Sequence, residues 1–307
     1  MSEPLFSVVV ATYQRPGPLA DCLQSLAQQH YPHDRFEVIV VDDDGGLSER
    51  AVREPLAGRL DLQFLQPGHG GPACARNTGA AQARGAWLYF VDDDCTLAPD
   101  VLSRLAAQVA RHPTAAIAGA CADAHPHNLW SAASQAQLDA VTSYFNRDAE
   151  HATSGASSHL AVPTAAFRAL GGFDVAFRTG EDRDFVDRWV RGGKALVYAP
   201  EVLVTHLHPR TFRALWQRNA GYGRGAWQFA QSRRALQTGA PRVDRGFYAH
   251  LLSYPFRARH QRRVRLLAGM LVARAAYMYG YCVVRFALAK RQRPSGRCYA
   301  ETERTPR

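Results

Sequence analysis

Apolar residues along the chain occur in short β-branched runs that alternate with longer stretches of helical period. Continuous runs of this kind are typical of strands buried on both faces of a sheet. They predict strands over Phe6–Ala11, Phe36–Val41, Leu60–Leu65, Trp87–Val91 and Ala115–Ala120. Helices are predicted over Ala73–Ala83 and Pro99–Arg111, and around Leu19, Cys22, Leu23 and Leu26. The alternation predicts an α/β fold with a mostly parallel sheet flanked by helices.

Two of the predicted strands end in three consecutive acids, residues 42–44 and 92–94. Ligands of parallel α/β sheets bind beyond the carboxyl ends of the strands, so both clusters are expected at one site. Neighbouring carboxylates repel one another unless a cation compensates them, and oxygen ligands suit Mg²⁺ or Mn²⁺. In an extended strand Asp92 and Asp94 would point the same way and could share one ion. Either cluster alone could equally be a solvated turn that caps the next helix.

A glycine-rich segment, residues 68–79, lies between the two clusters and contains Arg76. Its glycines allow a loop that approaches a ligand closely, and Arg76 could contact a phosphate or one of the acids. A flexible loop followed by an exposed helical arginine explains the segment equally well when it is considered alone.

Taken in order, these segments resemble the motifs of the family 2 glycosyltransferases of the GT-A fold. The resemblance rests on the residues at 7–15, 40–45, 71–79 and 90–94, followed by Gly171-Gly172-Phe173-Asp174 and Gly180-Glu181-Asp182. It covers about residues 5–210, and short motifs in a fixed order are specific as a set. The resemblance implies a GT-A type sheet that binds a nucleotide-sugar.

The resemblance also implies a role for each matching residue. Thr12, Tyr13, Arg15 and Asp43 would line the nucleotide, and Arg76 would approach its diphosphate. The metal–diphosphate would be held by Asp92 and Asp94, with Asp93 between them and His206 as a further metal ligand. Asp182 would be the catalytic base, with Glu181 beside it. From the residues alone, the alternative for Asp182 is an acid in the first turn of a helix, and the alternative for His206 is an ordinary partly buried histidine.

The implied reaction moves one sugar from a nucleotide-diphosphate-sugar to an acceptor hydroxyl, with inversion and with help from Mn²⁺ or Mg²⁺. Processive relatives carry a Gln-x-x-Arg-Trp motif, and the nearest stretch here, residues 217–225, lacks the tryptophan. The sequence therefore favours single transfers, to a glycan or lipid-linked acceptor in the synthesis of cell-envelope polysaccharide. Residues 123–160 match no motif, although this part of the fold often shapes the acceptor site.

Charge divides the chain unevenly. Residues 1–204 contain 16 Lys and Arg and 24 Asp and Glu. Residues 205–307 contain 21 Lys and Arg and only three Asp and Glu. We predict a catalytic domain over residues 1–210, with a nucleotide-sugar half at 1–121 and an acceptor half at 122–210. Residues 211–290 are predicted to be helical, basic and membrane-associated, and residues 291–307 to be a disordered tail.

Within the basic part, Leu266–Leu288 is long enough to cross a bilayer, but Arg274 near its middle would be costly in hydrocarbon. Three interpretations stay open: a helix on the membrane surface, a helix packed on the catalytic domain, or a membrane span. The N-terminus has no signal-peptide pattern, and the six cysteines need not form disulfides in a chain this long, so we expect a cytoplasmic protein, with a peripheral position on the inner membrane face left open.

Three other functions are alternatives, and each is opposed by a feature of the sequence. Asp92-Asp93-Asp94-Cys95-Thr96 matches the nucleophile motif of haloacid-dehalogenase-type phosphatases, but Lys194 follows the later acids instead of preceding them. The turn after the first strand, Thr12–Pro16, lacks the G-x-G-x-x-G of dinucleotide-binding oxidoreductases. The basic region could bind nucleic acid, but the acidic clusters oppose this, and we expect no nucleic-acid partner.

Overall fold

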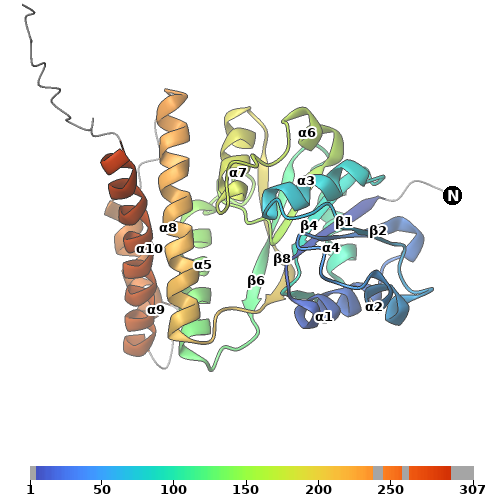
Figure 1. Cartoon of the computed structure of the whole chain (residues 1–307), viewed down its shortest axis with the longest axis horizontal. Helices are drawn as coiled ribbons and strands as arrows, with labels where there is room; N and C mark the ends of the chain where they lie inside the picture. Colours follow the sequence, from blue (N-terminus) through green and yellow to red (C-terminus); the bar gives the residue numbers. More distant parts are fainter. Residues whose placement is uncertain (1–4, 238–244, 258–262, 292–307) are drawn as a thin grey trace, which may run out of the picture.

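The computed structural model describes residues 5–237, 245–257 and 263–291, which form one eight-stranded sheet and its covering helices (Figure 1). The strands lie in the order β3-β2-β1-β4-β7-β6-β8-β5. Their bounds are β1 Phe6–Thr12, β2 Phe36–Asp42, β3 Leu62–Leu65, β4 Trp87–Asp92, β5 Cys95–Leu97, β6 Ala116–Asp123, β7 His159–Pro163 and β8 Leu196–His206. The predicted α/β fold is confirmed, and the antiparallel neighbours are those made by β7 and β5.

Helices cover both faces of the first part of the sheet, which explains its unbroken apolar strands. On one face, α1 (Pro16–Ala27) and α4 (Val101–Arg111) pack on alternate strand residues such as Val8 and Val10. On the other face, α3 (Pro72–Gln82), α6 (Thr164–Ala169) and α7 (Glu181–Arg191) pack on Val9 and its neighbours. The short α2 (Glu49–Arg53) lies beside α1 in Figure 1.

The predicted elements of the first 120 residues are confirmed to within a few residues at each end. The helix expected to begin at Pro99 begins at Val101, because the amide of Val101 bonds back to the carbonyl of Ala98 in a turn. Sequence patterns did not reveal β5, β7 and β8. The first is three residues long, and the antiparallel β7 enters the sheet between two strands far from it in sequence.

His159 ties β7 to its surroundings from a fully buried position. Its Nε2 lies against the carbonyl oxygen of Val202, so this nitrogen must carry the hydrogen, and its Nδ1 accepts from the hydroxyl of Tyr89 at 2.6 Å. Burial lowers the pKa of His159 to about 4, so the ring is neutral near pH 7.

Four helices form a further layer at one end of the sheet (Figure 1). They are α5 (Leu129–Phe145), α8 (Phe212–Ala235), α9 (Arg245–Arg257) and α10 (Arg263–Arg291). Small residues let α8 and α10 approach closely: a Cβ on Gly223 would lie 1.9 Å from the carbonyl oxygen of Tyr277. Ala133, Ala136 and Ala140 of α5 pack against apolar residues of α9 and α10.

Helix α10 contains the apolar segment singled out in the sequence. Residues Arg263–Arg285 are long enough to span a membrane and contain an 18-residue stretch with a mean hydropathy of 1.4, of which 28% is buried. The helix packs on α5 and α8, as the second of the three interpretations expected. The predicted division into domains stays a prediction, and the predicted tail lies outside the described residues beyond Arg291.

Candidate functional site

The two acidic clusters meet at one edge of the sheet, as predicted. Strand β1 pairs with β2 on one side and β4 on the other, which places Thr12 beside Asp42 and Ala11 beside Asp92. The three strands are parallel, so their carboxyl ends, and the loops that follow them, share this edge.

Asp43 orders the glycine-rich loop. Its carboxylate accepts the backbone amides of Gly70 at 2.8 Å and Gly71 at 3.0 Å, and it lies 2.9 Å from Nδ1 of His69. Gly71 has a φ of 88°, a conformation that favours glycine. The neighbouring Asp42 accepts the amide of Leu47, so both buried acids hold turns of the backbone.

Tyr13 presents an exposed ring at the same loop. Its side chain is 43% exposed, and its centroid lies 5.1 Å from that of His69. Exposed planar rings beside a sheet edge offer a stacking surface for a flat ligand such as a nucleotide base.

Arg15 neutralises the second acidic cluster. It contacts Oδ1 of Asp93 at 2.5 Å and Oδ2 of Asp94 at 2.7 Å, and Thr12 donates to Asp93 at 2.7 Å. Burial raises the pKa of Asp93 to about 6, in part offset by the charge of Arg15 and the hydrogen bond from Thr12. The structure therefore places Arg15 on the acidic turn, and its contact with the nucleotide stays a prediction.

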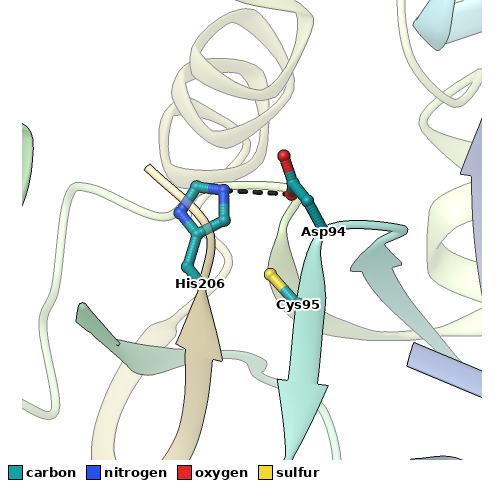
Figure 2. A group of neighbouring side chains, drawn as sticks. All are labelled: Asp94, Cys95 and His206. Atoms are coloured by element: carbon teal, nitrogen blue, oxygen red, sulfur yellow. Dashed lines mark ion pairs between the residues drawn. The ribbon is translucent and has the colours of Figure 1, made fainter. Parts of the chain in front are cut away.

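Asp94, Cys95 and His206 form a buried group of possible metal ligands (Figure 2). Pairing of β5 with β8 sets Cys95 opposite His206, and Oδ1 of Asp94 lies 3.1 Å from Nε2 of His206. Burial would raise the pKa of Asp94, but the hydrogen bond and charge of His206, with Arg15 and Arg218, lower it. One ligand atom from each residue lies within 4.8 Å of the others, which fits a single ion.

Asp92 does not join this group. Asp93 and Asp94 form a turn rather than an extended strand, so the strand alternation expected to align Asp92 with Asp94 is absent, and a shared ion stays a prediction. Asp92 is instead 2.5 Å from Nη2 of Arg76, whose Nη1 lies 2.6 Å from Oε1 of Glu181. Arg76 is buried, so this bridge connects the acidic turn to the start of α7 in a low-dielectric setting.

The residue after Arg76 fixes the Gly-Gly-Phe-Asp segment. The side chain of Asn77 donates to the carbonyl of Phe173 at 2.7 Å and accepts its amide at 2.9 Å. A Cβ on Gly172 would lie 2.7 Å from Oδ1 of Asn77, so glycine is required there. Two adjacent residues of α3 thus bind different parts of the site: Arg76 pairs with Asp92 and Glu181, and Asn77 holds the Gly-Gly-Phe-Asp segment.

Asp182 lies half-buried in the first turn of α7. Its carboxylate accepts the backbone amides of Arg183 at 2.7 Å and Ser157 at 3.3 Å, and no ion pair found among the described residues involves it. Burial raises its pKa, against the effect of these hydrogen bonds and of the charge of Arg76. Burial and the neighbouring Asp182 likewise raise the pKa of Glu181. Asp182 is therefore a carboxylate with free accepting capacity and an enhanced affinity for protons.

Sequence reasoning missed three residues that the structure places at the site. These are Asn77, Cys95 and Arg218, whose Nη2 lies 3.3 Å from Nε2 of His206. Asn77 lies inside a recognised motif and could have been found there. Cys95 and Arg218 reach the site through strand pairing and helix packing, for which no sequence signal exists.

The chain was compared with known families and proteins. The model of glycosyl transferase family 2 matches residues 7–168. Poly(ribitol-phosphate) beta-N-acetylglucosaminyltransferase TarS of Staphylococcus aureus is 36% identical over 109 residues, which are 35% of this chain and 19% of TarS. Glycosyltransferase AglE of Haloferax volcanii is 25% identical over 228 residues, covering 73% of this chain and 74% of AglE. The chain thus spans about a fifth of TarS and about three quarters of AglE.

Solved structures share the fold at low identity. The mannosyltransferase PcManGT from Pyrobaculum calidifontis, in complex with GDP-Man and Mn²⁺, has a TM-score of 0.60 at 20% identity, over 94% of this chain and 81% of that one. S. aureus TarS 1–349 in complex with UDP-GlcNAc has a TM-score of 0.54 at 18% identity, over 94% of this chain and 92% of that one.

The family match decides between the transferase and phosphatase interpretations of the acidic turn. It spans more than half of the chain and includes the residues of the two acidic clusters and the arginine bridge to Asp92. The protein belongs to glycosyl transferase family 2.

Proposed function

We propose that the protein transfers one sugar at a time from a nucleotide-diphosphate-sugar to an acceptor hydroxyl, with inversion at the anomeric carbon. The observation that carries the proposal is the Asp92–Arg76–Glu181 bridge, which holds the acidic turn next to Asp182. Such a bridge would keep the leaving group and the base in fixed relation, which transfer between two bound substrates requires.

Asp182 would be the base. Its carboxylate would take the proton of the acceptor hydroxyl while the hydroxyl oxygen bonds to the anomeric carbon and the bond to the diphosphate breaks. The pKa of Asp182, raised by burial, suits it to this role, because a stronger base removes a proton from a poor nucleophile more readily.

Asp94 and His206 would hold Mn²⁺ or Mg²⁺, with Cys95 beside them and Asp92 facing the same edge of the sheet. The fit rests on the carboxylate of Asp94 and the imidazole of His206, which converge in a buried position, whereas the thiol of Cys95 is a softer ligand than Mn²⁺ or Mg²⁺ prefers. When bound, the ion would neutralise charge on the leaving diphosphate. Nε2 of His206 faces Asp94, so the protein already directs both groups at one point.

The nucleotide would lie along the loops after β1 and β2. Tyr13 offers its exposed ring to the base, and Thr12, Asp43 and Asp93 hold the surrounding turns. Arg15 is 46% exposed on its side chain, so it is accessible to the diphosphate while it contacts the acids. The support from other proteins is that structural neighbours at 18–20% identity are complexes with GDP-Man or UDP-GlcNAc.

Two variants test the site separately. Asp94→Ala should abolish the metal-dependent rise in melting temperature produced by the cognate nucleotide, in a screen of UDP, GDP and dTDP with and without Mn²⁺. Asp182→Asn should keep that rise but lose about 10²–10⁴-fold in transfer rate. Wild-type transfer by Asp182→Asn would refute the assignment of the base. Absence of any nucleotide response in folded wild-type protein would refute the proposed donor.

We also propose that α9 and α10 attach a cytoplasmic enzyme to the inner membrane face, where an envelope acceptor would be met. Exposed apolar side chains lie on both helices: Tyr248, Leu252 and Phe256 on α9, and Val264, Leu271 and Met278 on α10. Exposed arginines accompany them at 245, 257, 263 and 265. Apolar and basic groups together favour an anionic lipid surface.

Vesicle sedimentation tests this attachment. The protein should pellet with anionic vesicles and much less with neutral ones, and Leu252→Glu with Leu271→Glu should release it. Equal recovery of wild type and variant in the supernatant would contradict the proposal.

A further inference from the structure

A cavity of about 530 Å³ lies against β6 and extends from Asp182 to the C-terminal helices. Helices α5 and α7 form its sides, and Phe229 of α8, Phe247 of α9 and Tyr277 of α10 also line it. The volume is that of a site for a small organic ligand. If Asp182 is the base, as proposed above, this cavity is where an acceptor hydroxyl can reach it.

Apolar side chains from α5 and α7 form part of the lining, beside the charged Asp182, Arg183, Asp187 and Arg191 of α7. Leu138, Val141 and Phe145 face it from α5, and Val186 and Val190 from α7. Such a wall would bind the apolar face of a sugar or a hydrocarbon group, because burial of apolar surface is favourable.

Most acids of the lining already have partners. Asp187 pairs with Arg191 and Arg233. Asp139 accepts hydrogen bonds from Gln135 and Tyr254. Asp182 differs from both, because only backbone amides are seen to donate to it.

Three arginines are found in the lining. Arg191 pairs with Asp187, Arg183 lies 4.6 Å from the ring centroid of Phe229 and forms no ion pair found among the described residues, and the third is Arg274 of α10. Its Nη2 donates to the hydroxyl of Tyr248 at 3.1 Å, and its guanidinium lies 4.5 Å from the ring centroid of Tyr277 and 5.3 Å from that of Tyr248. It takes part in none of the ion pairs found over residues 5–237, 245–257 and 263–291. Aromatic rings orient a guanidinium but leave most of its N–H donors free for an anion.

The position of Arg274 also explains how an arginine is tolerated in the middle of an apolar helix. It lines the cavity and lies on the same stretch of the α10 surface as the exposed Leu271 and Met278, which are three and four residues away. Tyr248, its hydrogen-bond partner, is 41% exposed, so Arg274 lies between the cavity and the outer apolar surface.

We propose that this cavity is the acceptor site and that the acceptor is an amphipathic molecule with an anionic group, which Arg274 binds. Its hydroxyl lies at Asp182, its body lies on the apolar wall of α5 and α7, and its phosphate or other anion contacts the guanidinium. The C-terminal helices are then part of the substrate site and not only a membrane attachment. The anion comes either from a free phosphorylated sugar or from the headgroup of a lipid.

Binding of three probes tests the proposal on the full chain: decyl phosphate below its micelle concentration, glucose 1-phosphate, and the neutral decyl β-D-glucoside. Calorimetry should show that Arg274→Gln weakens decyl phosphate binding tenfold or more and changes glucoside binding less than twofold. Arg274→Lys should recover part of the loss. Arg285→Gln is the matched control, because Arg285 lies on the same helix, is exposed and does not line the cavity.

Each outcome has a defined meaning. Loss of glucose 1-phosphate binding in Arg274→Gln identifies a free phosphorylated sugar as the anion source, whereas binding of decyl phosphate alone identifies a lipid headgroup. Equal weakening of charged and neutral probes, or no effect of Arg274→Gln on decyl phosphate, overturns the proposal. The nucleotide-induced rise in melting temperature, measured on the same samples, reports the donor site separately, so failure of the proposed function is seen independently.

Discussion

Replacement of Arg76 by methionine would remove the charge that bridges the two halves of the site. Methionine fills a similar volume, so the variant mainly leaves the carboxylates of Asp92 and Glu181 without their partner at 2.5 and 2.6 Å. The side chains of Arg76 and Glu181 are each 7% exposed, so water cannot replace the lost contacts. Breaking a buried ion pair on one side costs about 3–5 kcal/mol.

The cost can be converted into a melting temperature. With an unfolding entropy of about 2.1 cal/mol/K per residue, a loss of about 4 kcal/mol lowers the Tm of this 307-residue chain by about 6 °C. Differential scanning calorimetry at pH 7.5 measures this decrease in Tm. The control is Arg50→Met, which breaks an exposed pair with Glu54 and should cost at most about 0.5 kcal/mol.

The defect should also depend on pH. Burial and Asp182 raise the pKa of Glu181 even in the presence of Arg76, which opposes them. Without Arg76, the folded state therefore binds a proton at Glu181 more tightly than the unfolded state does, so the destabilisation shrinks as pH falls. Adding Glu181→Gln to Arg76→Met should restore part of the Tm, because one of the two uncompensated charges is gone. A Tm within 1 °C of wild type for Arg76→Met at pH 7.5 would refute this account of the bridge.

Two further predictions concern the fold. Gly223→Ala should lower the free energy of unfolding in urea by about 1–3 kcal/mol, since the new Cβ would lie 1.9 Å from the carbonyl oxygen of Tyr277. The control Gly17→Ala, where a Cβ would meet no atom within 4 Å, should not lower it. Stability should fall by about 3 kcal/mol as pH drops from 6.5 to about 4, because unfolded His159 takes up a proton that the folded ring, with its pKa lowered to about 4, refuses. A urea midpoint for Gly223→Ala equal to that of wild type would contradict the first prediction. A His159→Gln variant that loses stability as steeply as wild type between pH 6.5 and about 4 would contradict the second.

The sequence by itself determined the α/β class, the first strands and helices, and the edge at which the acids gather. These depend on local patterns: an apolar run such as Val8–Val10 buries both faces of a strand wherever it lies in the sheet. Motif order was sufficient to assign the family, which the family model confirmed.

Tertiary structure alone decided how the charged residues are partnered. Asp92 and Asp94 are two positions apart, yet one contacts Arg76 and the other His206, because a turn separates them. Cys95 reaches His206 through the pairing of β5 with β8, and Arg274 reaches the cavity of Asp182 through the packing of α10. Periodicity encodes which side of an element is buried, but not which distant element covers it. The contacts of Asp92, Cys95 and Arg274 depend on which element covers which.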